Sequence, residues 1–159
     1  MGGKDYVIHS EEELLDIRRA AAAAATVREH IRQVTTVGMT TRQIDDLAAS
    51  FIAETGGISA FLGYRGFPGQ ICISVNDQVV HGIGRPDRVL QPNDIVSTDI
   101  GVKIGKGIGD TSATFALVDN PPEDIVRLLE ATEESLMAGI AAAVVGNTIR
   151  DISAAVEKV

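Results

Sequence analysis

The chain has 159 residues, 45% of them hydrophobic, which is enough to bury a core without disulfides. Its formal net charge of −8 argues against nucleic-acid binding, which depends on Lys and Arg. The single cysteine, Cys72, excludes an internal disulfide, and no apolar run reaches the roughly 18 residues that a membrane span needs. Because the N-terminal residues form no secretory segment, we expect a cytoplasmic protein that binds neither membrane nor nucleic acid.

Two helices are expected in the first third of the chain. A capping box at Ser10 predicts a helix through about Val34, and its alanine run, residues 20–25, is typical of a helix in tight packing. A second capping box at Thr40 predicts a helix that ends near Gly56.

Strands are expected in the middle of the chain. Two short runs at about 71–75 and 78–81 flank the turn-forming dipeptide Asn76-Asp77. Two longer alternating runs, Ile95–Ile104 and Ile108–Val118, have the period of half-buried strands, and the glycines between them suit the turn of a β-hairpin.

Asp99 and Asp110 lie on the two arms of this hairpin. A two-residue loop would place Asp110 opposite Asp99 or one step diagonal to it, on the same face, whereas an odd-length loop without a bulge would separate the two. Together they can reach one divalent cation or bridge two. The alternative is a pair of solvated aspartates on an exposed strand. Small neighbours on the same face favour a cavity instead: Ser97, Gly101 and Ser112.

A group of aromatic residues suggests a binding pocket. Three of the six aromatics, Phe61, Tyr64 and Phe67, fall within seven residues, and Cys72 follows shortly after. Rings and a sulfur atom suit the thioether of methionine, although ordinary core packing is the alternative. His81 follows the same segment, and its alternative role is that of a structural hydrogen-bonding residue.

The chain closes with two further expected helices. One starts at Asn120-Pro121 and runs through about Val145, and another starts at Thr148 and continues to the last residues. The pattern Gly-x-Thr-x-Arg-x-Ile at residues 38–44 recurs at 146–152, an offset of 108. A chance match is the alternative to a true repeat. We therefore expect an α+β chain with a first α/β repeat at about 10–118 and helices opening a second repeat at about 121–159.

Three segments carry a resemblance to a known family: CISVNDQVVHGI at 72–83, DIVSTDIG at 94–101 and GDTS at 109–112. They are similar, in this order, to the motifs of the type I methionine aminopeptidases, which are pita-bread metallopeptidases. The resemblance implies that Asp99 is a bidentate metal ligand, that Asp110 bridges two metals and that His81 contacts the scissile peptide group. It also implies that Phe61, Tyr64, Phe67 and Cys72 bind the substrate side chain.

The activity implied by the resemblance is removal of the N-terminal methionine from nascent polypeptides. It implies two divalent ions (Co, Mn, Fe or Zn) that activate a hydroxide, N-terminal Met peptides as partners, and leaves ribosome association open. The family's remaining ligands, a histidine and two glutamates, have no counterpart up to Val159. We therefore expect a single incomplete catalytic domain that is inactive alone.

The alternative is a non-catalytic half-length relative that self-associates or binds a partner. The sequence also departs from the commonest family pattern at Arg65, Phe67 and Gly84, where His, Tyr and Pro are frequent. These departures bear on substrate preference more than on the class of reaction.

Overall fold

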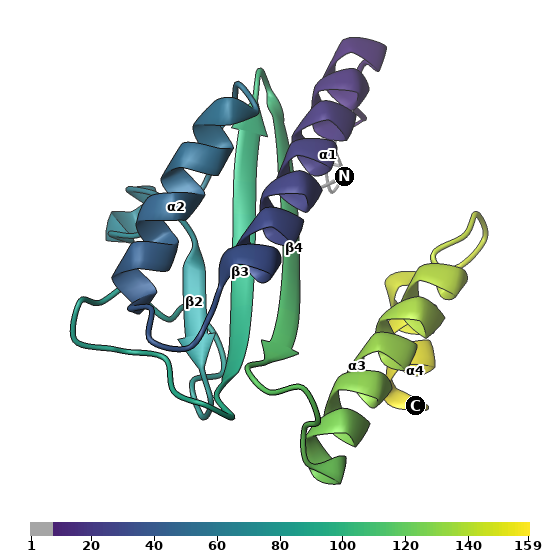
Figure 1. The fold of residues 1–159 in the computed structure, drawn as a ribbon. Coiled ribbons are helices and arrows are strands. Elements are labelled where there is room, and N and C mark those ends of the chain that lie inside the picture. The colour runs from purple at the N-terminus through teal and green to yellow at the C-terminus, as the bar shows by residue number, and fades with distance from the viewer. Residues whose placement is uncertain (1–7) are drawn as a thin grey trace. The chain divides into compact units, whose positions relative to one another are not determined.

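The computed structural model describes residues 8–159, which divide into two compact units, one ending at Leu117 and the other running from Val118 to Val159 (Figure 1). The mixture of helices with an antiparallel sheet confirms the expected α+β class. No helix in this part of the chain is long and apolar enough to cross a membrane. In chain order the elements are α1 (Glu11–Val34), α2 (Thr41–Glu54), β1 (Ile58–Ser59), η1 (Tyr64–Gly66), β2 (Cys72–Val75), β3 (Ile95–Ile104), β4 (Gly107–Ala116), α3 (Glu123–Ala142) and α4 (Ile149–Glu157).

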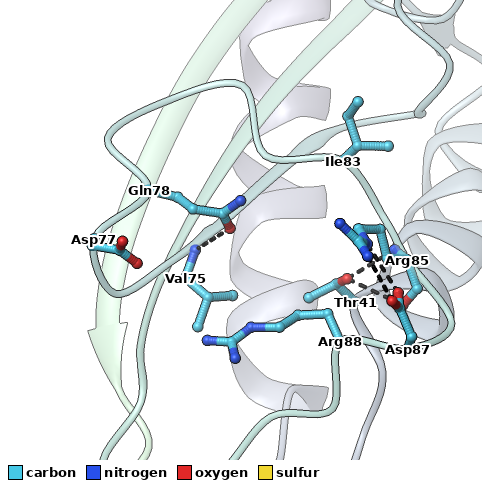
Figure 2. Close-up of a pocket in the computed structure, with 8 residues that line it drawn as sticks. All are labelled: Thr41, Val75, Asp77, Gln78, Ile83, Arg85, Asp87 and Arg88. Atoms are coloured by element: carbon cyan, nitrogen blue, oxygen red, sulfur yellow. Dashed lines mark hydrogen bonds and ion pairs between the residues drawn. The ribbon is translucent and has the colours of Figure 1, made fainter.

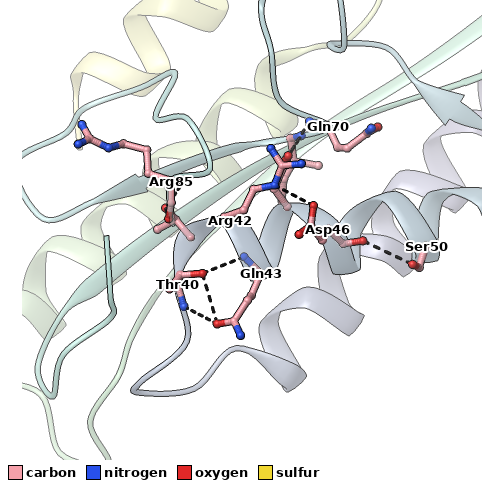
Figure 3. A network of polar contacts seen from close by, with 10 residues as sticks. Thr40, Arg42, Gln43, Asp46, Ser50, Gln70 and Arg85 are labelled. Atoms are coloured by element: carbon pink, nitrogen blue, oxygen red, sulfur yellow. Dashed lines mark hydrogen bonds and ion pairs between the residues drawn. The ribbon is translucent and has the colours of Figure 1, made fainter. Parts of the chain in front are cut away.

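Both N-terminal helices start at the expected capping boxes. The Ser10 hydroxyl accepts a hydrogen bond from the Glu13 amide at 3.2 Å, and the Glu13 carboxylate accepts one from the Ser10 amide at 3.0 Å. Figure 3 shows the same reciprocal pair at α2, where Gln43 accepts from the Thr40 amide at 2.8 Å. These side chains satisfy amide groups that the first helical turn leaves without partners.

The sheet of residues 8–117 is built around β3. This strand pairs antiparallel with β4 over its full length, with β2 along its first half and with β1 near its end. The turn between β3 and β4 has two residues, Gly105 and Lys106, because Ile104 pairs with Gly107. Gly105 supplies the positive φ, 56°, that such a tight turn needs.

Helices α1 and α2 cover one face of this sheet (Figure 1). The alanine run of α1 lies in tight packing, as expected: Ala20 and Ala24 are fully buried. Opposite it, a Cβ atom on Gly109 of β4 would lie 2.3 Å from the backbone carbonyl of Ala20, so the helix and strand backbones are in direct contact. The core between the layers is mainly aliphatic: Val27, Ile31, Ile44, Ala48, Ile71, Ile73, Leu90, Val96, Ile100 and Val102.

The second unit consists of two helices, α3 and α4. The expected end of the third helix at Val145 is too late, because α3 stops at Ala142, where the Asn147 side chain donates a hydrogen bond to the last carbonyl at 2.9 Å. The capping box at Thr148 starts α4 as predicted, and the helix ends at Glu157. Gly146 has a φ of 98° and Gly38 one of 90°, so the two similar segments share a left-handed glycine and a threonine cap.

The predicted strand at about 78–81 is wrong. Positive φ angles at Asn76 (58°) and His81 (60°) bend this segment away from an extended course, and Val79 is 86% exposed. The segment returns to β2 only at Gly82, whose carbonyl accepts a hydrogen bond from the Ile73 amide at 2.9 Å. The two-residue strand β1 was not expected, because so short a run shows no readable alternation.

Asp45 of α2 fixes the segment that enters β2. Its side chain is only 3% exposed, and one carboxylate oxygen accepts hydrogen bonds from the amides of Gln70 (2.7 Å) and Ile71 (3.1 Å). Burial raises the pKa of this carboxyl, although the two hydrogen bonds act in the opposite direction.

Replacing Asp45 separates the effect of burying its charge from the effect of its two hydrogen bonds. Asp45→Ala leaves two buried amides without an acceptor and should lower the free energy of unfolding by about 2–4 kcal/mol at pH 7. Asp45→Asn keeps an acceptor oxygen, removes the buried charge and should be as stable as the wild type or up to about 1 kcal/mol more stable. Because the folded pKa is raised, protonation favours the folded state, so any advantage of Asp45→Asn should shrink as the pH falls toward 3.8. Urea unfolding at several pH values measures this, and equal losses in both variants would contradict it.

The contact between α1 and β4 gives a second prediction. Gly109→Ala places a methyl group against the Ala20 backbone, which cannot move aside as a flexible side chain would, so unfolding free energy should fall by about 1–3 kcal/mol. Ile108→Ala is the matched control, because that neighbouring side chain is 53% exposed and should matter little. Urea unfolding of both variants measures the difference, and a Gly109→Ala protein as stable as the control would contradict it.

Candidate metal centre and its cavity

A cavity of about 580 Å³ lies beside β2 and β3. Ile100 belongs to the core under the helices, and side chains alternate along a strand, so Asp99 points to the opposite face of the sheet. All seven candidate site residues line this cavity: Phe61, Tyr64, Phe67, Cys72, His81, Asp99 and Asp110. Four further residues complete its wall: Arg65, Gly66, Pro68 and Ile83.

The two aspartates occupy the diagonal position that a two-residue loop allows. Asp110 pairs with Gly101 and Asp99 pairs with Ser112, so the carboxylates lie one diagonal step apart on the same face. Burial, followed by the negative charge of Asp110 and a hydrogen bond with it, raises the pKa of Asp99 to about 6. Because the charge of Asp110 disfavours the ionised form of Asp99, a divalent cation bound to both carboxylates would relieve this repulsion.

His81 enters the cavity from a left-handed backbone conformation. Its φ of 60° is uncommon for a residue other than glycine, although histidine adopts this region more often than most residues do. The next residue holds it in place, because the Gly82 amide donates to the Ser74 hydroxyl at 3.1 Å and the Gly82 carbonyl accepts from Ile73. Strain of this kind persists only where the surroundings enforce it, and it is concentrated at functional sites.

The aromatic part of the wall is attached to the sheet at two points. The Ser59 hydroxyl donates to the Gln70 carbonyl at 2.6 Å and accepts from the Phe61 amide at 3.1 Å, which closes the loop over residues 59–70. The Phe61 ring lies directly over β3, since a Cβ on Gly101 would be 2.4 Å from it. The ring is thereby fixed beside the strand that carries Asp99.

Cys72 is buried and pairs with Asp99 across β2 and β3. Burial, followed by the charges of Asp99 and Asp110, raises the pKa of its thiol to about 11. At neutral pH it is therefore an uncharged, polarisable sulfur, which suits contact with an apolar ligand and not nucleophilic attack.

A second cavity, of about 390 Å³, lies near the N-terminal end of α2 (Figure 2). Its two arginines already have partners. Arg85 forms two hydrogen bonds with Asp87, at 2.9 and 2.5 Å, and Arg88 lies 3.9 Å from the carboxylate of Asp94. Figure 2 shows Arg85 folded over Asp87 and Thr41, so neither arginine of this cavity is an unpaired positive charge for an anionic ligand.

Among the described residues, no group of three or more His, Cys, Asp or Glu side chains is arranged to hold a metal ion. Asp99 and Asp110 are the two carboxylates that line the larger cavity. Arg65 was not a predicted site residue, although its place between Tyr64 and Phe67 was a signal that the cavity would include it. For Ile83, the position two residues after His81 was the one feature of the sequence that indicated a place in the cavity.

The chain is similar in sequence to known metallopeptidases. The model of metallopeptidase family M24 matches residues 16–159. The chain is 43% identical over 148 residues to methionine aminopeptidase 1 of Mycobacterium tuberculosis, covering 93% of this chain and 55% of the relative. It is 39% identical over 151 residues to methionine aminopeptidase 1 of Bacillus subtilis, covering 95% and 60%. The chain therefore spans little more than half the length of these relatives.

Solved structures give the same result for the fold. The chain superposes on methionine aminopeptidase from Rickettsia prowazekii with a TM-score of 0.89 at 34% identity, covering 96% of this chain and 60% of that one. Prolidase from Pyrococcus furiosus shares the fold alone, with a TM-score of 0.81 at 18% identity, covering 95% and 43%. These matches confirm the pita-bread fold and the resemblance carried by the three motifs, and the chain belongs to metallopeptidase family M24.

Proposed function

We propose that this chain supplies one side of the active site of a methionine aminopeptidase, which removes the N-terminal methionine from newly made polypeptides. The observation that carries the proposal is the pair of facing carboxylates, Asp99 and Asp110, in a cavity walled by aromatic rings and an uncharged sulfur. The names of the M. tuberculosis and B. subtilis relatives support it.

Asp99 and Asp110 would hold two divalent cations together with further ligands in addition to these two carboxylates. Such cations supply Lewis-acid activation of water and of the peptide carbonyl. His81 donates a hydrogen bond to the substrate's peptide group from its fixed position at the cavity.

The aromatic wall binds the first side chain of the substrate. Phe61, Tyr64 and Phe67 exclude water around it, and the Cys72 sulfur offers a soft contact for a thioether. A contact between sulfur and a ring edge is worth about 0.3–1.5 kcal/mol, so several such contacts distinguish methionine from smaller side chains.

Cation binding tests the central pair. Asp99→Asn and Asp110→Asn should each weaken Mn²⁺ binding at least about tenfold by calorimetric titration, because each removes a charged ligand. Asp87→Asn is the matched control, since that carboxylate is exposed and lies outside this cavity. In metal-free buffer, Asp99→Asn should raise the midpoint of thermal unfolding, because it removes the repulsion between the two carboxylates. Equal Mn²⁺ affinity in all proteins would contradict the site and favour the non-catalytic alternative.

Peptide hydrolysis tests the reaction. The chain alone, with Mn²⁺ or Co²⁺, should cleave a Met-Ala-Ser peptide negligibly, because two carboxylates leave a dinuclear site short of ligands. Mixed with a polypeptide that carries the remaining metal-ligand segment of a methionine aminopeptidase, it should release methionine, and Asp110→Asn should abolish this release. Sustained cleavage by the purified chain alone would show that the site is more complete than we propose, and no release by the mixture would count against the function.

A further inference from the structure

Arg65 is the one lysine or arginine among the residues that line the metal-site cavity. It is exposed, whereas Phe67 and Cys72 on the same wall are partly or fully buried. Its charge is therefore placed at the outer edge of the cavity, whose other charged or polar side chains include the two carboxylates and His81. A peptide that fills the buried part and extends past this edge would meet that charge.

The backbone holds Arg65 in an uncommon conformation. Within residues 8–159, four residues other than glycine have a positive φ: Arg65, Asn76, His81 and Asn93. Asparagine and histidine are enriched in this region, but arginine rarely adopts it. Arg65 (φ 50°, ψ 28°) and His81 both line this cavity, so two of these four residues lie there.

The loop around Arg65 is closed by its own hydrogen bonds. The Gly63 amide donates to the Phe67 carbonyl at 2.8 Å, and the Phe67 amide donates to the Tyr64 carbonyl at 3.0 Å. The Gly66 amide donates to the Gly63 carbonyl at 3.2 Å. These bonds form a tight one-turn loop that fixes where the Arg65 side chain leaves the backbone.

The guanidinium of Arg65 is oriented and has donors to spare. Its central carbon lies 5.5 Å from the centroid of the Tyr64 ring, within the range of a cation–π contact. In the described part of the chain, no carboxylate forms an ion pair with it, in contrast to Arg32, Arg42 and Arg85. A planar group with five N–H donors is suited to a carboxylate, which it binds in a bidentate manner.

We infer that Arg65 makes this site prefer peptides that carry an acidic side chain after the small second residue. The inference rests on the proposed function, which places the first side chain among the aromatic rings and the first peptide bond at Asp99 and His81. Later residues then pass the exposed edge where Arg65 lies. The charge on the edge acts on the substrate's own charge, so the preference should weaken with added salt.

Equilibrium binding tests the inference independently of turnover. The probes are Met-Ala-Glu-Gly-NH₂ and Met-Ala-Gln-Gly-NH₂, whose amidated ends leave the glutamate as the one carboxylate that differs. With Mn²⁺ present, the wild-type chain should bind the glutamate peptide about three- to fivefold more tightly by calorimetric titration, the size expected for an exposed charge pair. The ratio should fall toward one in 0.5 M salt.

Two variants remove the guanidinium. Arg65→Gln should reduce the affinity ratio to about one, and Arg65→Gly should do the same while fitting the left-handed backbone without strain, so misfolding cannot explain both results. Arg65→Lys keeps the charge without the planar fork and should keep part of the preference. Arg42→Gln is the matched control, because it removes an exposed arginine of α2 outside the cavity and should keep the wild-type ratio (Figure 3).

The outcomes separate the inference from the proposed function. An unchanged ratio in Arg65→Gln and Arg65→Gly, a wild-type ratio of one, or no binding of either peptide would each overturn the inference. None of these results depends on cleavage. A glutamate preference that disappears in both variants would support the inference even if the hydrolysis experiment failed.

Discussion

The two-residue turn at Gly105-Lys106 sets the register on which both faces of the sheet depend. It places Asp110 beside Gly101 and one diagonal step from Asp99. On the opposite face, the same register brings Gly109 against the backbone of α1. A shift of one residue would turn the whole set of β4 side chains over, which would bury the carboxylate under the helix and expose the glycine. Cavity and core are thus two consequences of one turn.

The cavity contains groups that oppose folding, and the aliphatic core under the helices stabilises the fold that holds them. Asp99 is half-buried beside a second carboxylate, which raises its pKa. Arg65 and His81 hold left-handed backbones, each of which opposes folding by an amount of order 1–3 kcal/mol. On the helix face most buried side chains are aliphatic, and the buried carboxylate of Asp45 accepts hydrogen bonds from two backbone amides. The core under the helices thus stabilises a fold that also maintains the less favourable groups of the cavity.

The sequence predicted those features that depend on local chemistry. Ser10 and Thr40 cap their helices through neighbours three residues away, and the β3–β4 hairpin follows from two alternating runs and a glycine turn, so nearby residues decide these elements. The prediction of a strand at 78–81 was wrong for the opposite reason. Its valines suggest a strand, but the positive φ at His81 and the hydrogen bonds of Gly82 to β2 are tertiary effects that the local pattern does not record.

The same distinction applies to the cavity. The spacing of Asp99 and Asp110 within one hairpin made their proximity predictable. Their proximity to Phe61 and His81 depends on two separate loops that return to the sheet. For Phe61 and His81, the resemblance to a family predicted a shared site, whereas the spacing in the sequence did not. The place of Arg65 at the cavity edge depends on a loop closed by backbone hydrogen bonds, which the sequence pattern does not predict.

The backbone contact between α1 and β4 also bears on thermal motion at the cavity. Where two backbones touch at Gly109 and Ala20, no side chain lies between them that changes rotamer and lets the layers slide. The strand that carries Asp110 is therefore held from behind by a rigid helix. The loop of residues 59–70, on the other side of the cavity, is attached by side-chain hydrogen bonds that involve the hydroxyl of Ser59 and the carboxylate of Asp45. One wall of the cavity is therefore held by direct backbone packing and the other by hydrogen bonds.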